Sequence, residues 1–183
     1  MKFPIFEYPS FHYQISDWNN KKQKIISKLN DQNFIRTDLQ NFETDRQTNN
    51  NNYLKYFVDI IRPELEKFCE EINVNCTVTD CWAVKYKQGD DQYVHNHRSR
   101  GFSGVLYLEY DPEVHKPTHF IAPWQDPITD ETTFGYFRNI KEGTIVIVPS
   151  YTLHYVPQNK STKTRTVIAF DILPKVSKIY WDK

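Results

Sequence analysis

The chain lacks the features that mark membrane-spanning, exported and nucleic-acid-binding proteins. No run of 18 apolar residues occurs in its 183 residues, and the first residues, MKFPIFEYPSFHYQ, contain no apolar segment of signal-peptide length. Lysine plus arginine and aspartate plus glutamate number 23 each, so the formal net charge is zero and no general phosphate-binding surface is indicated. We therefore expect a cytoplasmic protein that binds neither a membrane nor a nucleic acid.

Cysteine is also scarce. Cys69, Cys76 and Cys81 are odd in number and match no zinc-binding spacing, which is typical of reduced, buried thiols. A chain of 183 residues buries roughly 70% of the surface that its unfolded form exposes, so it needs no disulfide or structural metal to fold. We expect a single domain over residues 1–183.

Residues 1–75 are expected to form a helical support region. One helix is predicted from Asp17, as its N-cap, to Asn30. The clearest helix is predicted over Tyr53–Ile72, where Pro63 favours a kink or two abutting helices. Its apolar residues recur every three or four positions along one face: Leu54, Phe57, Ile61, Leu65, Phe68 and Ile72.

The connection between these helices, residues 37–52, is polar and ends in four consecutive asparagines. Such a segment buries too little apolar surface to order itself, so it is expected to be a mobile surface loop. A lid over a functional site is the alternative.

Residues 76–173 are expected to form a β-rich core. Aromatic residues make up 15% of the chain, which favours strands. Alternation within 77–87 places Val78, Trp82, Val84 and Tyr86 on one face. Further strands are predicted at 102–110, 118–122, 144–148, 155–156 and 164–172. Helices followed by many short strands predict an α+β fold with an antiparallel barrel or jelly roll and the N-terminal helices packed on one sheet.

Three histidines are candidates for a metal site. His95 and His97 share a strand face with Cα atoms about 6.6 Å apart, so both imidazoles can bind one ion. An isolated H-x-H pair is common on surfaces without a metal. Here a second element follows, the apolar run Gly143–Val148, then Pro149 and His154. Together the two segments predict a shared metal site.

Both segments resemble families that hold a metal inside a barrel. Gly89 with the H-x-H pair is similar to the first cupin pattern, although no glutamate follows it. Gly143, Pro149 and His154 are similar to the second cupin pattern, although Tyr151 stands where a glycine is usual.

The closer resemblance is to the Fe(II)- and 2-oxoglutarate-dependent oxygenases, particularly the prolyl-hydroxylase-like branch and its bacteriophage relatives. It covers Asp80–Asp171 and rests on an ordered series of matches: Tyr86, Gly89, His95-Asn96-His97, the strand SGVLYL, Gly143 to Pro149, His154 and Arg165. The resemblance implies a double-stranded β-helix, the cupin-like jelly roll.

The resemblance also implies a role for each site residue. His95, His97 and His154 would hold Fe(II), and these three are the expected catalytic centre. Arg165 would bind the far carboxylate of 2-oxoglutarate, because a guanidinium presents a planar fork of donors. Tyr107 would hydrogen-bond that carboxylate and Tyr86 would line the cofactor pocket.

One position departs from the family pattern. His97 stands where the family has aspartate or glutamate, so the usual set of two histidines and one carboxylate is changed to three histidines. The alternative is that Asp126, in the segment Trp124–Pro127, completes the shell in place of His97.

The function that follows is a dioxygenase that uses 2-oxoglutarate and O2 to hydroxylate an organic substrate and releases succinate and CO2. A prolyl or other peptide residue is the preferred substrate by family analogy. The rivals are a cupin-type dioxygenase or isomerase without 2-oxoglutarate and a non-catalytic jelly-roll binding module.

Substrate choice is assigned to the Asn-rich connection and to the insert 111–138, which contains His115, His119, Trp124 and Phe134. His12, His115 and His119 are expected to be ordinary surface or loop histidines.

Overall fold

A computed structural model describes residues 9–29, 33–48, 53–97 and 100–175. The helices in this part of the chain are α1 (Trp18–Ile26), a short 3-10 helix (Arg46–Thr48) and α2 (Leu54–Glu71). The strands are β1 (Phe11–Gln14), β2 (Glu43–Thr44), β3 (Cys76–Tyr86), β4 (Gln92–His95), β5 (Phe102–Glu109), β6 (His119–Gln125), β7 (Thr132–Gly135), β8 (Thr144–Pro149), β9 (His154–Val156) and β10 (Arg165–Pro174).

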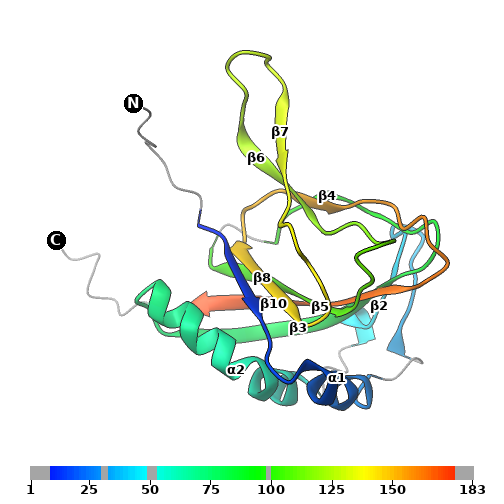
Figure 1. The fold of residues 1–183 in the computed structure, drawn as a ribbon, viewed down its shortest axis with the longest axis vertical. Helices are drawn as coiled ribbons and strands as arrows, with labels where there is room; N and C mark the ends of the chain where they lie inside the picture. Colours follow the sequence, from blue (N-terminus) through cyan, green and yellow to red (C-terminus); the bar gives the residue numbers. More distant parts are fainter. Residues whose placement is uncertain (1–8, 30–32, 49–52, 98–99, 176–183) are drawn as a thin grey trace.

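The strands form two antiparallel sheets, as the sequence predicts (Figure 1). The larger sheet has the order β1-β8-β5-β10-β3-β2 and the smaller has the order β4-β9-β6-β7. Residues of both sheets line one cavity, so the sheets are the two walls of the expected jelly roll. None of the helices in the described residues is long and apolar enough to cross a membrane.

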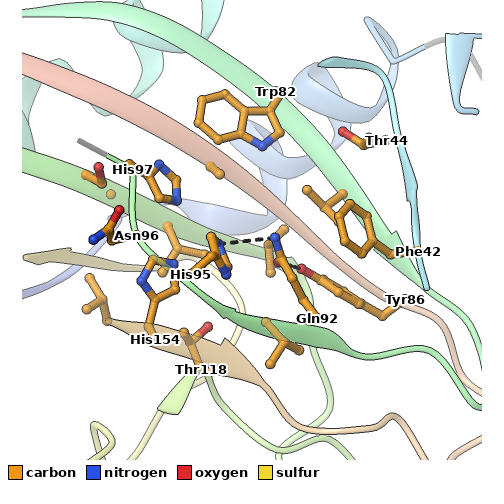
Figure 2. Close-up of a pocket in the computed structure, with 18 of the residues that line it drawn as sticks. Phe42, Thr44, Trp82, Tyr86, Gln92, His95, Asn96, His97, Thr118 and His154 are labelled. Carbon is orange, nitrogen blue, oxygen red and sulfur yellow. Dashed lines mark hydrogen bonds between the residues drawn. The ribbon is translucent and has the colours of Figure 1, made fainter. Parts of the chain in front are cut away.

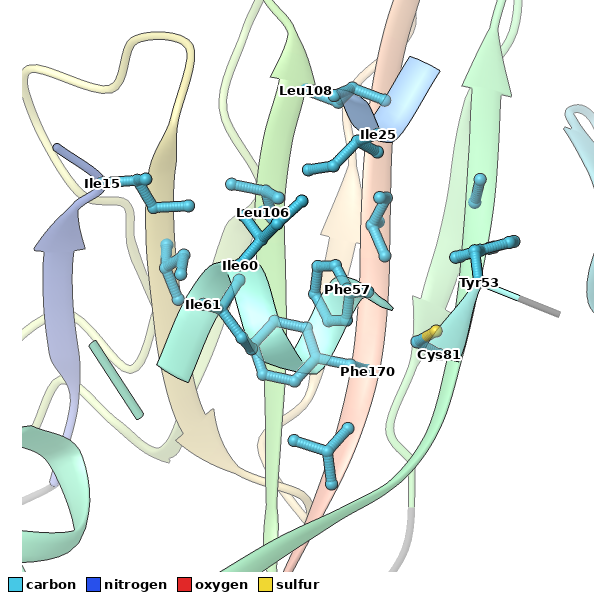
Figure 3. Packing of buried hydrophobic residues seen from close by; sticks show 14 of the residues in the cluster. Ile15, Ile25, Tyr53, Phe57, Ile60, Ile61, Cys81, Leu106, Leu108 and Phe170 are labelled. Atoms are coloured by element: carbon cyan, nitrogen blue, oxygen red, sulfur yellow. The ribbon is translucent and has the colours of Figure 1, made fainter. Parts of the chain in front are cut away.

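The two helices lie on the outer face of the larger sheet, which confirms the predicted helical layer (Figure 1). Helix α2 buries Phe57 and Ile61 against the strands (Figure 3), and Phe68 belongs to the same core. Each such side chain contributes roughly 1.5–3 kcal/mol when it leaves water. The core therefore lies between α2 and the sheet, and the other face of the sheet is left for the cavity.

Strand β10 lies at the centre of the larger sheet, between β5 and β3. Because side chains alternate along a strand, its even-numbered residues Ile168, Phe170 and Ile172 pack toward the helices. Its odd-numbered residues, among them Val167 and Ala169, face the cavity between the sheets. One strand thus separates the hydrophobic core from the candidate site.

The predicted helix ends need correction. Helix α1 ends at Ile26 rather than Asn30. Asp17 is the N-cap residue, but its backbone is left-handed (φ 50°) and its side chain makes no hydrogen bond to the first turn of the backbone. The carboxylate of Asp17 instead accepts a hydrogen bond from the side-chain amide of Asn20 at 2.8 Å. Helix α2 is continuous through Pro63, so the chain does not divide there into two abutting helices.

The prediction of a mobile loop is wrong for residues 37–48. The segment pairs with β3 through β2, and Phe42, Thr44 and Asp45 are buried. Asp45 accepts hydrogen bonds from the backbone of Ala83 at 2.8 Å and from the hydroxyl of Tyr53 at 2.7 Å. These partners anchor a polar sequence to the sheet. The four asparagines, 49–52, lie outside the described residues.

One predicted face is also wrong. Trp82 and Tyr86 face the cavity, but Val78 packs in the core under the helices. The register of β3 against β10 shifts between Asp171 and Ile172, which pair with Asp80 and Val78. This irregularity leaves an extra residue on β3 and moves Val78 to the opposite face.

Gly104 of β5 offers a test of the core packing. A Cβ atom there would lie 2.1 Å from the ring of Phe170, which is fully buried and has no room to move. We expect Gly104→Ala to lower the free energy of unfolding by about 1–3 kcal/mol, as overpacking does. Gly135→Ala is the control, because nothing lies within 4 Å of that position. Urea unfolding measures both, and equal effects would contradict the packing account.

Candidate metal centre

The two strands β4 and β9 bring the predicted histidines together. They pair antiparallel with His95 directly opposite His154. His97 follows β4, and its backbone N–H donates to the carbonyl of Ser150 at 2.9 Å, which holds it beside the turn before β9. The ring centroids of His95 and His154 lie 4.2 Å apart, and that of His97 lies 5.5 Å and 5.2 Å from them (Figure 2).

Hydrogen bonds set the tautomer of each ring. Nδ1 of His95 contacts the carbonyl of Tyr93 at 2.8 Å, and Nδ1 of His154 contacts the carbonyl of Thr152 at 2.9 Å. A carbonyl only accepts, so both Nδ1 atoms carry the proton and both Nε2 atoms are unprotonated; that of His95 accepts a hydrogen bond from Gln92 at 3.1 Å. Nδ1 of His97 is likewise bound, to a carboxylate oxygen of Asp171 at 3.1 Å.

Burial keeps the rings of His95 and His154 neutral. It lowers the pKa of His154 to about 3, with a further contribution from the neighbouring His95. Burial also lowers the pKa of His95, against an opposing hydrogen bond to Tyr93. Neutral imidazole is the form that binds a metal, so the site is ready for an ion at neutral pH.

The arrangement fits a divalent transition metal. One ligand nitrogen from each histidine lies within 4.8 Å of the others, and no other such group of histidine, cysteine or acidic side chains occurs among the described residues. Two nitrogens on one ion at about 2.0–2.1 Å lie at most about 4 Å apart, so small rotations of the rings bring all three to one ion. Imidazole ligands suit iron, zinc, copper and nickel.

Asp126 does not join this group. Its carboxylate accepts hydrogen bonds from the backbone N–H groups of Ile128 at 2.9 Å and Thr129 at 3.0 Å in the turn between β6 and β7. Those backbone bonds lower its pKa and keep it in the hairpin turn. Within the described residues, the geometry therefore favours His97 over Asp126 as the third ligand.

A cavity of about 160 Å³ adjoins the three histidines and runs between the two sheets. Phe42, Tyr86 and Gln92 are among the residues that line it (Figure 2). Gln92 accepts from the hydroxyl of Tyr86 at 2.5 Å and donates to Nε2 of His95 at 3.1 Å. Pockets for drug-sized ligands are roughly 300–1,000 Å³, so this cavity suits a smaller molecule.

Arg165 is fully buried at the first residue of β10, with 2% of its surface exposed. Its Nη2 donates to the hydroxyl of Thr118 at 3.0 Å, but its Nε and Nη1 have no partner. The rings of Tyr86 and Tyr107 flank the guanidinium at 5.2 Å and 5.3 Å. A buried cation without an anion costs several kcal/mol, so this geometry indicates a bound anionic group.

A family model of the 2OG-Fe(II) oxygenases matches residues 80–171, which is half of the chain and includes all six predicted site residues. The chain belongs to this family. It is therefore an oxidoreductase with Fe(II) and 2-oxoglutarate as cofactors. No curated protein matches it by sequence.

Solved structures of other oxygenases share the fold. HygX from Streptomyces hygroscopicus, solved with nickel and 2-oxoglutarate bound, has a TM-score of 0.67 at 9% identity, covering 92% of this chain and 84% of its own. The carbocyclase SnoK from nogalamycin biosynthesis has a TM-score of 0.68 at 10% identity, covering 91% and 79%. The collagen prolyl hydroxylase of Paramecium Bursaria Chlorella virus-1 has a TM-score of 0.58 at 14% identity, covering 91% and 96%.

The remaining histidines of the oxygenase are not part of the cluster. His12 is exposed on β1 and stacks on Phe137. His119 lies on β6 and contacts the hydroxyl of Tyr155 at 2.9 Å. His115 is a loop residue, as predicted, but it is buried rather than on the surface, because it accepts from the backbone of Asp111 and contacts the carbonyl of Lys163.

Three residues of the site were not predicted from the sequence. Gln92 and Thr118 contact His95 and Arg165, but neither belongs to a recognisable motif. Asp171 had a usable signal, since it lies an even number of residues after Arg165 on one strand and therefore faces the same side. Burial raises the pKa of Asp171, but hydrogen bonds from His97 and Ser103 outweigh it, so the net shift is downward and the group is a carboxylate.

The low pKa of His154 predicts how stability depends on pH in the metal-free oxygenase. Between about pH 6.5 and pH 3 the unfolded chain binds a proton at His154 and the folded chain does not, so the free energy of unfolding falls as the pH drops. The substitution His154→Asn removes the proton that the unfolded chain binds at this position. From pH 7 to pH 5, we expect the free energy of unfolding to fall by about 2 kcal/mol less in this variant than in the wild type.

Urea unfolding in the presence of a chelator at both pH values measures this difference. His12→Asn is the control, because that ring is exposed. An equal loss in the wild type and His154→Asn would show that His154 is not held neutral in the fold.

Proposed function

We propose that His95, His97 and His154 hold the ferrous iron of this oxygenase through their Nε2 atoms. The support is the bonding of each Nδ1 atom, which leaves three unprotonated nitrogens facing one point. Three neutral ligands leave the ion with its full double positive charge. The dianion 2-oxoglutarate has the charge to balance it.

We further propose that Arg165 binds the carboxylate of 2-oxoglutarate that is remote from the metal. The observation that carries this proposal is the buried guanidinium with two unbonded nitrogens. A carboxylate there accepts from an unbonded N–H of the guanidinium and balances its charge. Thr118 already bonds the third nitrogen, and it fixes the orientation of the fork.

The two tyrosines have different roles in this proposal. The hydroxyl of Tyr107 accepts a hydrogen bond from the backbone of Thr118 at 3.0 Å, so its own proton remains available to the carboxylate. The hydroxyl of Tyr86 donates to Gln92, so this ring forms a wall of the pocket and keeps water out. A cupin-type enzyme without 2-oxoglutarate has no use for this buried cation.

Bound iron and 2-oxoglutarate supply the oxidation, in which O2 and 2-oxoglutarate are converted to succinate and CO2 while a substrate C–H bond becomes C–OH. The protein supplies orientation and exclusion of water. Apolar residues of both sheets, Val146, Val148 and Val156 among them, enclose the inner pocket. No side chain is required as a general base.

For the substrate we propose a peptide with a prolyl or similar side chain. Gln40, Arg46, Trp82 and Asn96 also line the cavity. The side-chain oxygen of Gln40 is buried without a partner, so it is an acceptor available to a peptide N–H group. The indole of Trp82 offers an apolar surface for a pyrrolidine ring.

The role of Arg165 is tested by Arg165→Met. We expect unchanged binding of ferrous iron but at least a hundredfold weaker binding of 2-oxoglutarate, because the carboxylate loses its only buried cation. Anaerobic titration measures both through the metal-to-ligand absorption band of the ternary complex. Succinate formation on admission of O2 should be lost in parallel.

Arg62→Met is the matched control, because Arg62 is exposed on α2 and pairs only with Asp59. It should bind 2-oxoglutarate as the wild type does. If Arg165→Met kept its affinity for 2-oxoglutarate, the proposed anchor would be wrong, and turnover without the cosubstrate would favour the cupin-type reaction.

The substrate proposal predicts that proline-containing peptides stimulate succinate formation and gain one oxygen atom by mass spectrometry. We expect Gln40→Ala to raise KM for such a peptide about tenfold, the effect of one lost hydrogen bond, with 2-oxoglutarate binding unchanged. Gln23→Ala, on the exposed face of α1, is the control. Stimulation by small ring compounds alone would contradict a peptide substrate.

A further inference from the structure

Asp171 is a buried carboxylate directly behind the candidate metal centre. It lies on the cavity side of β10, six residues after Arg165, and only 5% of its surface is exposed. Its Oδ1 accepts hydrogen bonds from Nδ1 of His97 and from the hydroxyl of Ser103, both at 3.1 Å. Its Oδ2 has no hydrogen-bond partner in the part of the chain that the structure describes. The iron and 2-oxoglutarate roles proposed above make no use of this group.

The surroundings of Asp171 hold His97 in one orientation. The hydroxyls of Ser103 and Ser150 are 2.8 Å apart, and the carbonyl of Ser150 accepts the backbone N–H of His97 at 2.9 Å. The indole of Trp82 stacks on the imidazole with ring centroids 5.4 Å apart. Backbone, ring face and ring edge of His97 are therefore all fixed, and its second nitrogen points away from the carboxylate.

The charge of Asp171 has few neighbours to balance it. No lysine or arginine forms an ion pair with it among the described residues, and its hydrogen-bond donors are an imidazole and a hydroxyl. The charge of Arg46 helps to lower the pKa of Asp171, but a buried carboxylate that is not directly paired with a cation is costly. A divalent ion on the far nitrogen of His97 would balance the charge through the ring, since a carboxylate on the N–H of a ligand imidazole makes the imidazole a stronger donor.

We propose that Asp171 is a positioning residue that fixes His97 as a metal ligand and supplies the negative charge that the ligand carboxylate supplies in other members of the family. This inference rests on the proposed three-histidine centre. In this arrangement the carboxylate of Asp171 does not touch the ion and is separated from it by the imidazole of His97. The centre keeps the negative charge nearby, while every protein atom that binds the ion is a nitrogen.

The same strand face carries both charges of the site. Arg165 stands at one end of it and Asp171 about 20 Å further along, a distance that follows from six residues at about 3.3 Å each. Val167 and Ala169 separate them. The cation is therefore placed for the distant end of the diacid and the anion for the metal, and the two do not neutralise each other.

The first test is the affinity for Mn(II) and Fe(II), measured anaerobically by calorimetry or equilibrium dialysis. We expect Asp171→Asn to weaken binding ten- to a hundredfold, which is typical of losing the carboxylate partner of a ligand histidine. Ser103→Ala keeps the contact with His97 and should have a smaller effect. His154→Ala should abolish binding and His12→Ala should leave it unchanged.

The second test separates a positioning role from a merely structural one. In a His97→Asp background the ligand is itself a carboxylate, so Asp171 becomes a like-charged neighbour. We expect Asp171→Asn to weaken metal binding in the wild type and to leave it equal or stronger in His97→Asp. A structural role predicts the same loss in both backgrounds, and that result would overturn the inference.

A third measurement needs no substitution. In the metal-free protein labelled with 15N-histidine, NMR should show His97 with its proton on Nδ1, and a proton on Nε2 would overturn the inference even if Asp171→Asn does not fold. If Asp171→Asn folds and binds metal as the wild type does while His154→Ala does not, the centre stands and the role of Asp171 fails. If His154→Ala also binds normally, the proposed centre itself fails.

Discussion

The alternation of side chains along β10 is the constraint on which the rest of the structure depends. Its even-numbered residues, such as Ile168 and Phe170, form the core with α2, and its odd-numbered residues face the cavity. Arg165 and Asp171 are held on the cavity side because burial of the other face leaves the strand no freedom to slip by one residue. A hydrophobic face thus determines the position of two buried charges.

The second constraint is the pairing of β4 with β9. It places His95 opposite His154, although 59 positions separate them in the chain, and a bond from His97 to the carbonyl of Ser150 brings the third ring beside them. Each imidazole also has its Nδ1 atom bound within the protein. Folding therefore orders the ligand side chains before a metal binds, which is the usual basis of preorganised metal sites.

The charges of the site form a pattern that explains its unusual composition. In the proposed centre, histidine at position 97 removes a negative charge from the ligands, and the buried Asp171 restores one behind it. Arg165 adds a positive charge at the other end of this strand face, where two of its nitrogens have no hydrogen-bond partner among the described residues. Such uncompensated groups reduce the stability of the empty protein, a cost that proteins commonly accept at functional sites.

The sequence by itself determined the fold class, the family and the cluster of His95, His97 and His154, because these depend on local periodicity and on motifs with defined spacing. It did not determine the order of 37–48, the helix-side position of Val78, or the partners Gln92 and Asp171. Those depend on contacts between residues far apart in the chain: the pairing of β2 with β3, and the irregular register of β10 against β3. Only the tertiary structure decides them, since a register shift or a distant partner leaves no periodic trace in the amino-acid pattern.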